Sequence, residues 1–215
     1  MRHGLVGTAP RGDGGTREPI DPIRFIGNRS SGKMGFALAD AAHERGARIT
    51  LITTVPPPSS DTYDTLQFVE TVSEMREAVL TACRSADVLL MAAAVSDFRV
   101  THPAAHKMKK QGQKLTLELV ENADFLLELP DTFVKVGFAA ETEDLIKNAR
   151  PKVVRKRLAF ICANDVTALD AGFAVDTNRI TILHATGEEE ALPLMSKRAV
   201  ADEILNRVVP LLARP

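Results

Sequence analysis

An apolar run from Asp87 to Ala94 limits the folds open to this chain more than any other stretch. Its residues are almost all apolar, which is typical of a strand buried on both faces in a parallel sheet. Residues 47–54 predict an earlier strand, and Thr71 with Glu74 forms a capping box that opens a helix between the two runs. A strand, a helix and a strand at this spacing predict a right-handed βαβ unit.

The C-terminal half continues the alternation of strands and helices. Val134–Ala140 and Leu158–Ala163 predict two more buried strands. The helix expected between them has acidic residues first and basic residues last, in agreement with its dipole, and Pro151 is expected to kink or divide it. Ser196 is placed to cap a last helix. The predicted fold class is α/β, a Rossmann-like open and mainly parallel sheet with helices on both faces.

Two segments do not follow this rhythm. Leucines recur at every second position of Leu115–Val120, which predicts a half-buried antiparallel strand that serves as a small flap or dimerisation strand. Residues 1–13 are rich in glycine and charge and show no period, so we expect a poorly ordered N-terminal arm. Residues 14–215 are expected to form a single domain.

Composition narrows the possible partners. The net charge of −1 over 215 residues gives no reason to expect a nucleic acid or a membrane as partner. The chain has neither a run of about 18 apolar residues nor a secretory signal. Cys83 and Cys162 each lie in an apolar run, which favours buried thiols in a reducing cytoplasm over reactive thiols. We therefore expect a cytoplasmic protein.

The stretch from Gly14 to Gly35 indicates an anion site. It is a loop of small residues that opens a helix, so free backbone N–H groups and the positive helix end point toward one place. Gly27, Gly32 and Lys33 fit a Walker A loop, but Met34 stands where the Mg²⁺-binding hydroxyl is required. A P-loop hydrolase is therefore disfavoured. The alternatives are another phosphate site or a turn that only connects a strand to a helix.

Two further segments point to a ligand. Ala92–Ala94 and Asp97 follow the buried strand, and ligands of open parallel sheets bind beyond the carboxyl ends of the strands. Asp97 could meet a ligand hydroxyl or a metal, or could only cap its own turn. Residues 102–114 carry two histidines and four lysines within a segment without apolar period. They form either a solvated basic loop or a mobile lid that supplies cations to a phosphate.

Several motifs together resemble bacterial phosphopantothenoylcysteine synthetase. They cover about residues 14–208 and occur in the order of that family. The sequence departs from the family at residues 7–13, which are poor strand material where the family has an apolar strand. The motifs are Gly14-Gly15-Thr16-Arg17-Glu18-Pro19-Ile20-Asp21, Asn28-Arg29-Ser30-Ser31-Gly32-Lys33-Met34-Gly35, Ala93-Ala94-Val95-Ser96-Asp97-Phe98, Lys107-Met108-Lys109-Lys110, Gly137-Phe138-Ala139-Ala140-Glu141-Thr142 and Ala163-Asn164-Asp165.

The resemblance implies a ligase of coenzyme A biosynthesis. Such an enzyme joins 4′-phosphopantothenate to L-cysteine through an acyl-cytidylate, and CTP becomes CMP and pyrophosphate. It also implies CTP as co-substrate, Mg²⁺ held mainly by triphosphate and water oxygens, and a homodimer. Family members are usually fused to, or associated with, a flavin-dependent decarboxylase. The CTP-using bacterial branch is indicated by Lys33-Met34-Gly35 and by the lysines of residues 107–110.

The resemblance also assigns roles to individual residues. Asn28 would hydrogen-bond the acyl intermediate, and Lys107 would approach the phosphates. The predicted nucleotide-binding residues are Ser30, Ser31, Gly32, Lys33, Met91, Ala92, Ala93, Asp97, Lys107, Ala123, Asp124, Phe125, Leu126, Phe138, Lys152 and Lys156.

Two alternative functions stay open at this point. A Rossmann reductase would use a nicotinamide cofactor, but no G-x-G-x-x-G follows the first strand and no Tyr-x-x-x-Lys pair is present, since Tyr63 is the only tyrosine. A non-catalytic nucleotide-binding domain would need fewer polar groups near one strand edge.

Overall fold

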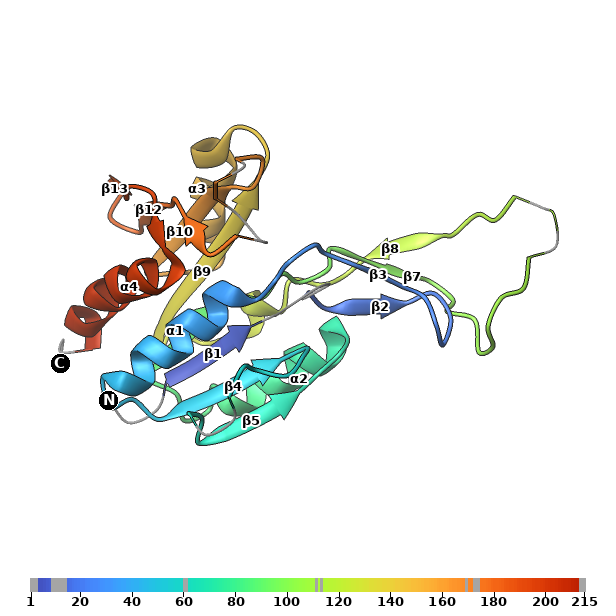
Figure 1. Cartoon of the computed structure of the whole chain (residues 1–215), viewed down its shortest axis with the longest axis horizontal. Coiled ribbons are helices and arrows are strands. Elements are labelled where there is room, and N and C mark those ends of the chain that lie inside the picture. The colour runs from blue at the N-terminus through green and yellow to red at the C-terminus, as the bar shows by residue number, and fades with distance from the viewer. Residues whose placement is uncertain are drawn as a thin grey trace.

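The computed structural model describes residues 4–8, 15–59, 62–110, 112, 114–168, 170–171 and 175–212. Its centre is an eight-stranded sheet with the order β13-β12-β10-β9-β6-β1-β4-β5 (Figure 1). The strands from β5 to β10 in this order pair in parallel, and β12 and β13 pair antiparallel at one edge. The bounds are β1 Gly4–Thr8, β4 Ile49–Thr53, β5 Thr65–Phe68, β6 Val88–Met91, β9 Val134–Glu141, β10 Phe160–Asp165, β12 Thr181–His184 and β13 Glu189–Ala191.

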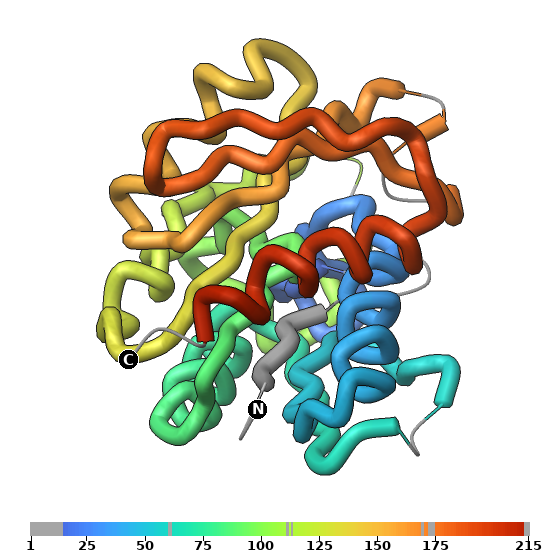
Figure 2. Tube along the Cα trace, turned by 90° about the vertical axis from the view of Figure 1, so that its left-hand side faces the viewer, coloured from blue at the N-terminus to red at the C-terminus, as the bar shows by residue number. Residues whose placement is uncertain are grey.

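Helices cover both faces of this sheet. Leu51 and Leu90 face α1 (Lys33–Glu44) and α4 (Lys197–Leu212), which lie side by side (Figure 2). Ile52 and Leu89 face the other way, toward α2 (Val72–Ala82). The third helix, α3 (Leu145–Arg155), packs on β10 over the same face as α2. Consecutive strand residues thus enter different cores, as the two-residue period of a strand requires. The predicted α/β fold class is confirmed.

The predicted elements occur close to their expected bounds. The strands expected at residues 47–54, 87–94, 134–140 and 158–163 are β4, β6, β9 and β10. The capping box is present, because the Thr71 side chain accepts from the Glu74 N–H and the Glu74 carboxylate accepts from the Thr71 N–H. Pro151 lies inside α3 and does not divide it.

The prediction of an N-terminal arm is wrong for Gly4–Thr8. These residues form β1, which pairs in parallel with β4 on one side and with β6 on the other. Hydrogen bonding along both edges favours a strand even where the local pattern is weak, and the sequence of one segment does not reveal its neighbours. Residues 1–3 and 9–13 of the expected arm lie outside the described residues.

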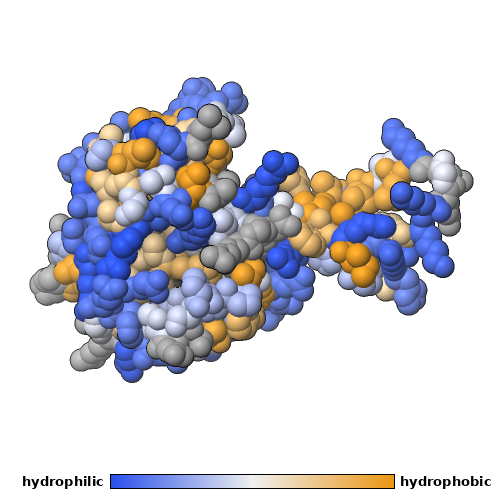
Figure 3. Space-filling model, viewed as in Figure 1, coloured by the Kyte–Doolittle hydropathy of each residue, from blue (hydrophilic) through white to orange (hydrophobic). Residues whose placement is uncertain are grey.

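Four short strands form an arm that projects from the body (Figure 1). They pair antiparallel as two hairpins, β2 with β3 and β7 with β8. The predicted strand at Leu115–Val120 is confirmed only at its end, and Leu119 and Val120 are exposed instead of half-buried. Apolar residues gather along the arm in Figure 3. The alternating leucines of this segment therefore belong to an apolar surface that no other part of the described chain buries. The strands are β2 Arg17–Pro19, β3 Phe25–Gly27, β7 Phe98–Val100 and β8 Leu119–Glu121.

The structure also bears on the two cysteines and on the expected absence of a membrane span. Cys83 and Cys162 are buried free thiols, and burial raises the pKa of Cys83 to about 12. No helix among the described residues is long and apolar enough to cross a membrane. The remaining elements are η1 (Phe125–Glu128) and a small hairpin of β11 (Thr177–Asn178) and β14 (Met195–Ser196) before α4.

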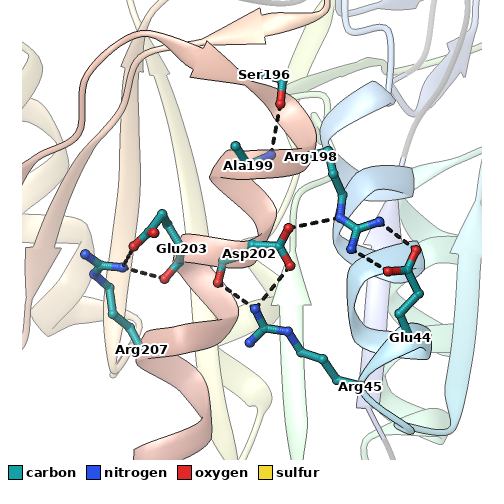
Figure 4. Close-up of polar contacts among 8 residues, drawn as sticks. All are labelled: Glu44, Arg45, Ser196, Arg198, Ala199, Asp202, Glu203 and Arg207. Carbon is teal, nitrogen blue, oxygen red and sulfur yellow. Dashed lines mark hydrogen bonds and ion pairs between the residues drawn. The ribbon is translucent and has the colours of Figure 1, made fainter.

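Polar contacts fix α4 against α1 (Figure 4). The Ser196 hydroxyl accepts from the Ala199 N–H at 3.1 Å, which confirms the predicted cap of α4. Asp202 of α4 accepts from Arg198 and from Arg45, each at 3.1 Å. Arg198 also donates to both carboxylate oxygens of Glu44 at 2.6 Å. These groups lie at the rim of the helix pair, while Leu38 and its apolar neighbours fill the interior.

We predict that Leu38→Ala lowers the free energy of unfolding by about 2–5 kcal/mol, because it leaves a cavity under α1. The comparison variant Asp202→Asn removes a carboxylate whose side chain is 36% exposed, so its cost should be at most about 1 kcal/mol. Urea denaturation of both variants measures the difference. Equal losses would show that the ion-pair network contributes as much as the apolar contact to holding the two helices together.

Candidate functional site

Two adjacent cavities lie near the carboxyl ends of β6 and β9. The larger has a volume of about 840 Å³ and the smaller about 100 Å³. Both are lined by Ala93, Ala94, Phe138 and Ala140, so they meet where these two strands end. This is the edge at which open parallel sheets bind ligands.

The larger cavity brings together most of the residues predicted from the motifs. They come from the loop after β3, the end of β6 and the loop after it, the segment before η1, η1 itself, β9 and α3. Those that line it are Asn28, Met91, Ala93, Asp97, Ala123, Asp124, Phe125, Leu126, Phe138, Lys152 and Lys156. Phe125 and Leu126 are buried and form part of its apolar wall, whereas Asp97 is exposed at the rim.

The cations of the larger cavity are held by carboxylates. Lys152 lies 2.6 Å from Glu141, and Lys156 lies 3.0 Å from Asp124. Arg155, which the sequence analysis did not single out, shares Asp124 at 3.1 Å. These pairs keep the long side chains ordered at the wall of the cavity. An anionic ligand would compete with Glu141 and Asp124 for the same cations.

The smaller cavity lies at the start of α1. Ser30, Ser31 and Gly32 line it as predicted, and Ala92 closes it from the sheet. Gly32 has φ 63°, a left-handed conformation that glycine adopts without strain. Gly32 is the N-cap of α1 and has no side chain to cap it, so the positive end of the helix lies beside a cavity that suits an anion.

Lys33 and Lys107 line neither cavity in the described structure. Lys33 forms an ion pair with Asp176 at 2.6 Å. Lys107 is exposed on the projecting arm. The next residue, Met108, is anchored there, because its N–H donates to the buried Asp21 carboxylate and its carbonyl accepts from Arg24. The segment predicted as a lid therefore has a fixed point near its lysines, and residues 111 and 113 lie outside the described residues.

The floor between the cavities is fixed by contacts with the Gly15–Thr16 segment. Thr16 donates its N–H to the Ala94 carbonyl at 3.1 Å, and its hydroxyl accepts from the Ser96 N–H at 2.8 Å. The Ser96 hydroxyl donates back to the Thr16 carbonyl at 3.0 Å. A Cβ at Gly15 would lie 2.6 Å from the Ala94 carbonyl oxygen, so only glycine permits this approach. The Asn28 amide then donates to the Val95 carbonyl at 3.1 Å.

Over residues 12–211 the sequence matches the family described as the DNA/pantothenate metabolism flavoprotein C-terminal domain. The chain belongs to this family. The resemblance predicted from the motifs is thereby confirmed at the level of the family.

Relatives of known structure and sequence agree with this membership. The coenzyme A biosynthesis bifunctional protein CoaBC of Bacillus subtilis (strain 168) is 47% identical over 204 residues, which are 92% of this chain and 50% of the relative. The Escherichia coli (strain K12) protein of the same name is 40% identical over 208 residues, 91% of this chain and 50% of the relative. A crystal structure of the C-terminal domain of a CoaBC protein has a TM-score of 0.78 at 34% identity and covers 98% of this chain and 95% of that chain. This chain thus spans about half the length of the curated relatives it matches.

The smaller cavity contains residues of this family member that sequence reasoning missed. Asn164 belongs to the Ala163-Asn164-Asp165 motif, but the sequence did not predict a binding role for it. Asn178 and Lys197 belong to no motif that would have indicated a site. Met34 also lines this cavity, although it lacks the hydroxyl of a P-loop. The preceding strand β3 pairs antiparallel with β2 outside the main sheet, which is not the parallel strand of a P-loop fold.

A divalent cation would find few protein ligands here. The described residues contain no group of three or more His, Cys, Asp or Glu side chains that could hold a metal. Asp97 and Glu121 are carboxylates that line the larger cavity. This donor set suits Mg²⁺ bound through one or two carboxylates with phosphate and water oxygens, and does not suit a metal enclosed by protein.

We predict that Thr16→Val destabilises the fold by about 1–3 kcal/mol, because the buried Ser96 N–H loses its acceptor. The matched control is Thr81→Val on the exposed side of α2, which should change the unfolding free energy by no more than about 0.5 kcal/mol. Denaturant unfolding of both variants tests this. If Thr16→Val is no more harmful than the control, the Thr16–Ser96 contact does not fix the floor of the site.

Proposed function

We propose that this domain is a phosphopantothenate–cysteine ligase of coenzyme A biosynthesis. The observation that carries the proposal is the larger cavity of a family member, in which Asn28 and Asp97 line the same space as Lys152 and Lys156. A cavity with an amide donor, a carboxylate and several cations suits a ligand with phosphates and a polar acyl group. Relatives at 47% and 40% identity are named for coenzyme A biosynthesis, which supports the same reaction class.

The proposed reaction has two steps. A carboxylate oxygen of 4′-phosphopantothenate attacks the α-phosphorus of CTP, and the bond from that phosphorus to the bridging oxygen breaks. Pyrophosphate leaves with the bonding electrons, and an acyl-cytidylate remains. The amine of L-cysteine then attacks the acyl carbon, CMP leaves from it, and the amine loses a proton. The protein has to orient the reacting groups and offset charge at phosphorus and at the acyl oxygen.

The described residues have suitable positions for these tasks. Asn28 is held at the cavity wall by the Val95 carbonyl, and its remaining amide N–H can meet an acyl oxygen. Lys152 and Lys156 offer positive charge from α3, and Phe138 lies where the two cavities meet. Asp97 at the rim is proposed to accept from a hydroxyl of the nucleoside. Ser30, Ser31 and Gly32 are proposed to face the phosphates at the start of α1.

CTP is proposed over ATP as the nucleotide. The base would lie between Met91–Ala93 and Ala123–Leu126, where backbone groups can read the edge of a small pyrimidine. A site that hydrogen-bonds one base rejects another that leaves its polar groups unpaired. Mg²⁺ would be held mainly by triphosphate and water oxygens, and a carboxylate of Asp97 or Glu121 could add a ligand. When bound, it offsets charge on the phosphates.

A homodimer fits the arm. Phe98, Leu119 and Val120 are large apolar side chains that this chain leaves exposed on β7 and β8. Burying them against a second copy would remove apolar surface from water. Lys107 must reach the phosphates either by movement of its own arm or from the arm of the second copy, because it lines neither cavity. Ordering of the segment at residues 102–114 by nucleotide is part of this proposal.

The remaining proposals concern the setting of the domain. Since the chain spans half of its bifunctional relatives, fusion to or association with a flavin-dependent decarboxylase is proposed. A cytoplasmic location is proposed from the buried thiols. The alternative function is non-catalytic nucleotide binding, or hydride transfer as in a Rossmann reductase. Both would use the same edge of the sheet without consuming cysteine.

We predict pyrophosphate release that requires phosphopantothenate, cysteine and nucleotide together, with kcat/KM for CTP at least about 10-fold above that for ATP. The measurement is a coupled pyrophosphate assay with each nucleotide in turn. A ratio near one, or in favour of ATP, would contradict the CTP assignment alone. Nucleotide binding without pyrophosphate release would favour the non-catalytic alternative, and a change in nicotinamide absorbance would favour the reductase.

We predict that Asn28→Asp slows amide formation about 10²–10³-fold and pyrophosphate release much less, because a carboxylate repels the acyl oxygen that the amide would bind. A rapid-quench experiment should show the acyl-nucleotide accumulating. The matched control is Asn148→Asp, which makes the same change in an exposed side chain on α3 that donates to the Glu143 carbonyl. Equal slowing of both steps by Asn28→Asp would reject the assigned role.

A further inference from the structure

The smaller cavity has a polar lining that the proposed roles do not use. Asn164 is the last residue but one of β10, Asn178 lies in β11, and Lys197 is the first residue of α4. All three line the cavity together with Ser30 and Gly32, and their exposed fractions are 7%, 4% and 5%. Burying polar side chains around a hollow is costly compared with apolar packing, so a polar occupant would explain their presence.

Local contacts hold Lys197 at this place. The β11–β14 hairpin brings residues 175–178 beside the start of α4, where the Lys197 N–H donates to the Asp176 carbonyl at 2.9 Å. The Lys197 ammonium donates to the Val175 carbonyl at 2.6 Å. The Asp176 carboxylate also attracts the Lys197 ammonium.

The charges around Lys197 are mixed. Among the described residues, Lys33 at the start of α1 repels it and Asp176 attracts it. Asp176 lies 2.6 Å from the Lys33 ammonium with 88% of its side chain exposed. Burial, together with the charge of Lys33, lowers the pKa of Lys197 to about 8. The ammonium groups of Lys33 and Lys197 are thus both attracted by the exposed Asp176 carboxylate, and a phosphate could take the place of that carboxylate.

We propose that Lys197, with Asn164 and Asn178, binds the β- and γ-phosphates of the nucleotide and then the pyrophosphate that leaves. The inference rests on the proposed function, because that reaction produces pyrophosphate. When the bond between the α-phosphorus and the bridging oxygen breaks, that oxygen leaves with the bonding electrons and carries the new negative charge. Lys197 stabilises this charge by a charge-assisted hydrogen bond and takes up no proton. Asp176 is the internal competitor that holds Lys33 until the phosphates arrive.

Inorganic pyrophosphate is the probe, and calorimetry measures its dissociation constant for the whole chain at pH 7. Lys197→Met should weaken binding about 10- to 100-fold, because one charge-assisted hydrogen bond is lost. The matched control Lys147→Met removes an exposed lysine of α3 and should leave the constant unchanged. Asp176→Asn, an exposed change that should not impair folding, should tighten binding severalfold. This second variant decides the question if Lys197→Met does not fold.

A pH series gives a further readout. Between pH 7 and pH 9 the wild type should lose affinity for pyrophosphate relative to Lys197→Arg, because the lysine loses its charge and the guanidinium does not. No binding by the wild type, or unchanged constants in both Lys197→Met and Asp176→Asn, would overturn the inference. If the protein is an active ligase but binds pyrophosphate equally well with and without Lys197, this inference alone is overturned. Lys197-dependent binding without any pyrophosphate release from CTP or ATP would overturn the proposed function alone.

Discussion

The close approach of Gly15 and Thr16 to the end of β6 is the contact on which the rest of the site depends. Reciprocal hydrogen bonds between Thr16 and Ser96 fix the backbone from Ala94 to Ser96. The same backbone receives the Asn28 amide through Val95, so the loop that opens α1 is positioned by the sheet. A side chain at position 15 would collide with the Ala94 carbonyl, and both cavities share Ala94 in their walls.

The positively charged side chains in and beside the site form ion pairs with carboxylates. Lys152, Lys156 and Lys33 each lie within 3.0 Å of an acidic side chain. Pairing lowers the cost of holding flexible cations near one another before a ligand is present. It also means that a phosphate has to displace carboxylates, so binding should weaken with ionic strength and depend on which acidic residue is replaced. This arrangement suits the multiply charged nucleotide of the proposed function.

The body and the arm of the molecule contribute different residues to this arrangement. The body supplies the two cavities and the cations of α1, α3 and α4. The arm carries Lys107 beside a backbone that Asp21 and Arg24 hold, and it exposes apolar side chains that the body does not cover. Several backbone hydrogen bonds lower the pKa of Asp21 despite its burial, so it stays ionised and the anchor persists at neutral pH. The division is consistent with a site completed by movement of the arm or by a second copy.

The sequence by itself determined the local elements and the family. Helix caps, buried runs and quoted motifs depend on neighbours in the chain, so the capping box at Thr71, strand β6 and the lining by Phe138 could be predicted. Only the tertiary structure decided that Gly4–Thr8 is a central strand, since its stability comes from β4 and β6 and not from its own pattern. It also decided that Asn164, Asn178 and Lys197 share one cavity and that Lys107 lies outside both. Contacts between residues far apart in the chain leave no period in the sequence, and the burial of a polar side chain depends on all the elements that surround it.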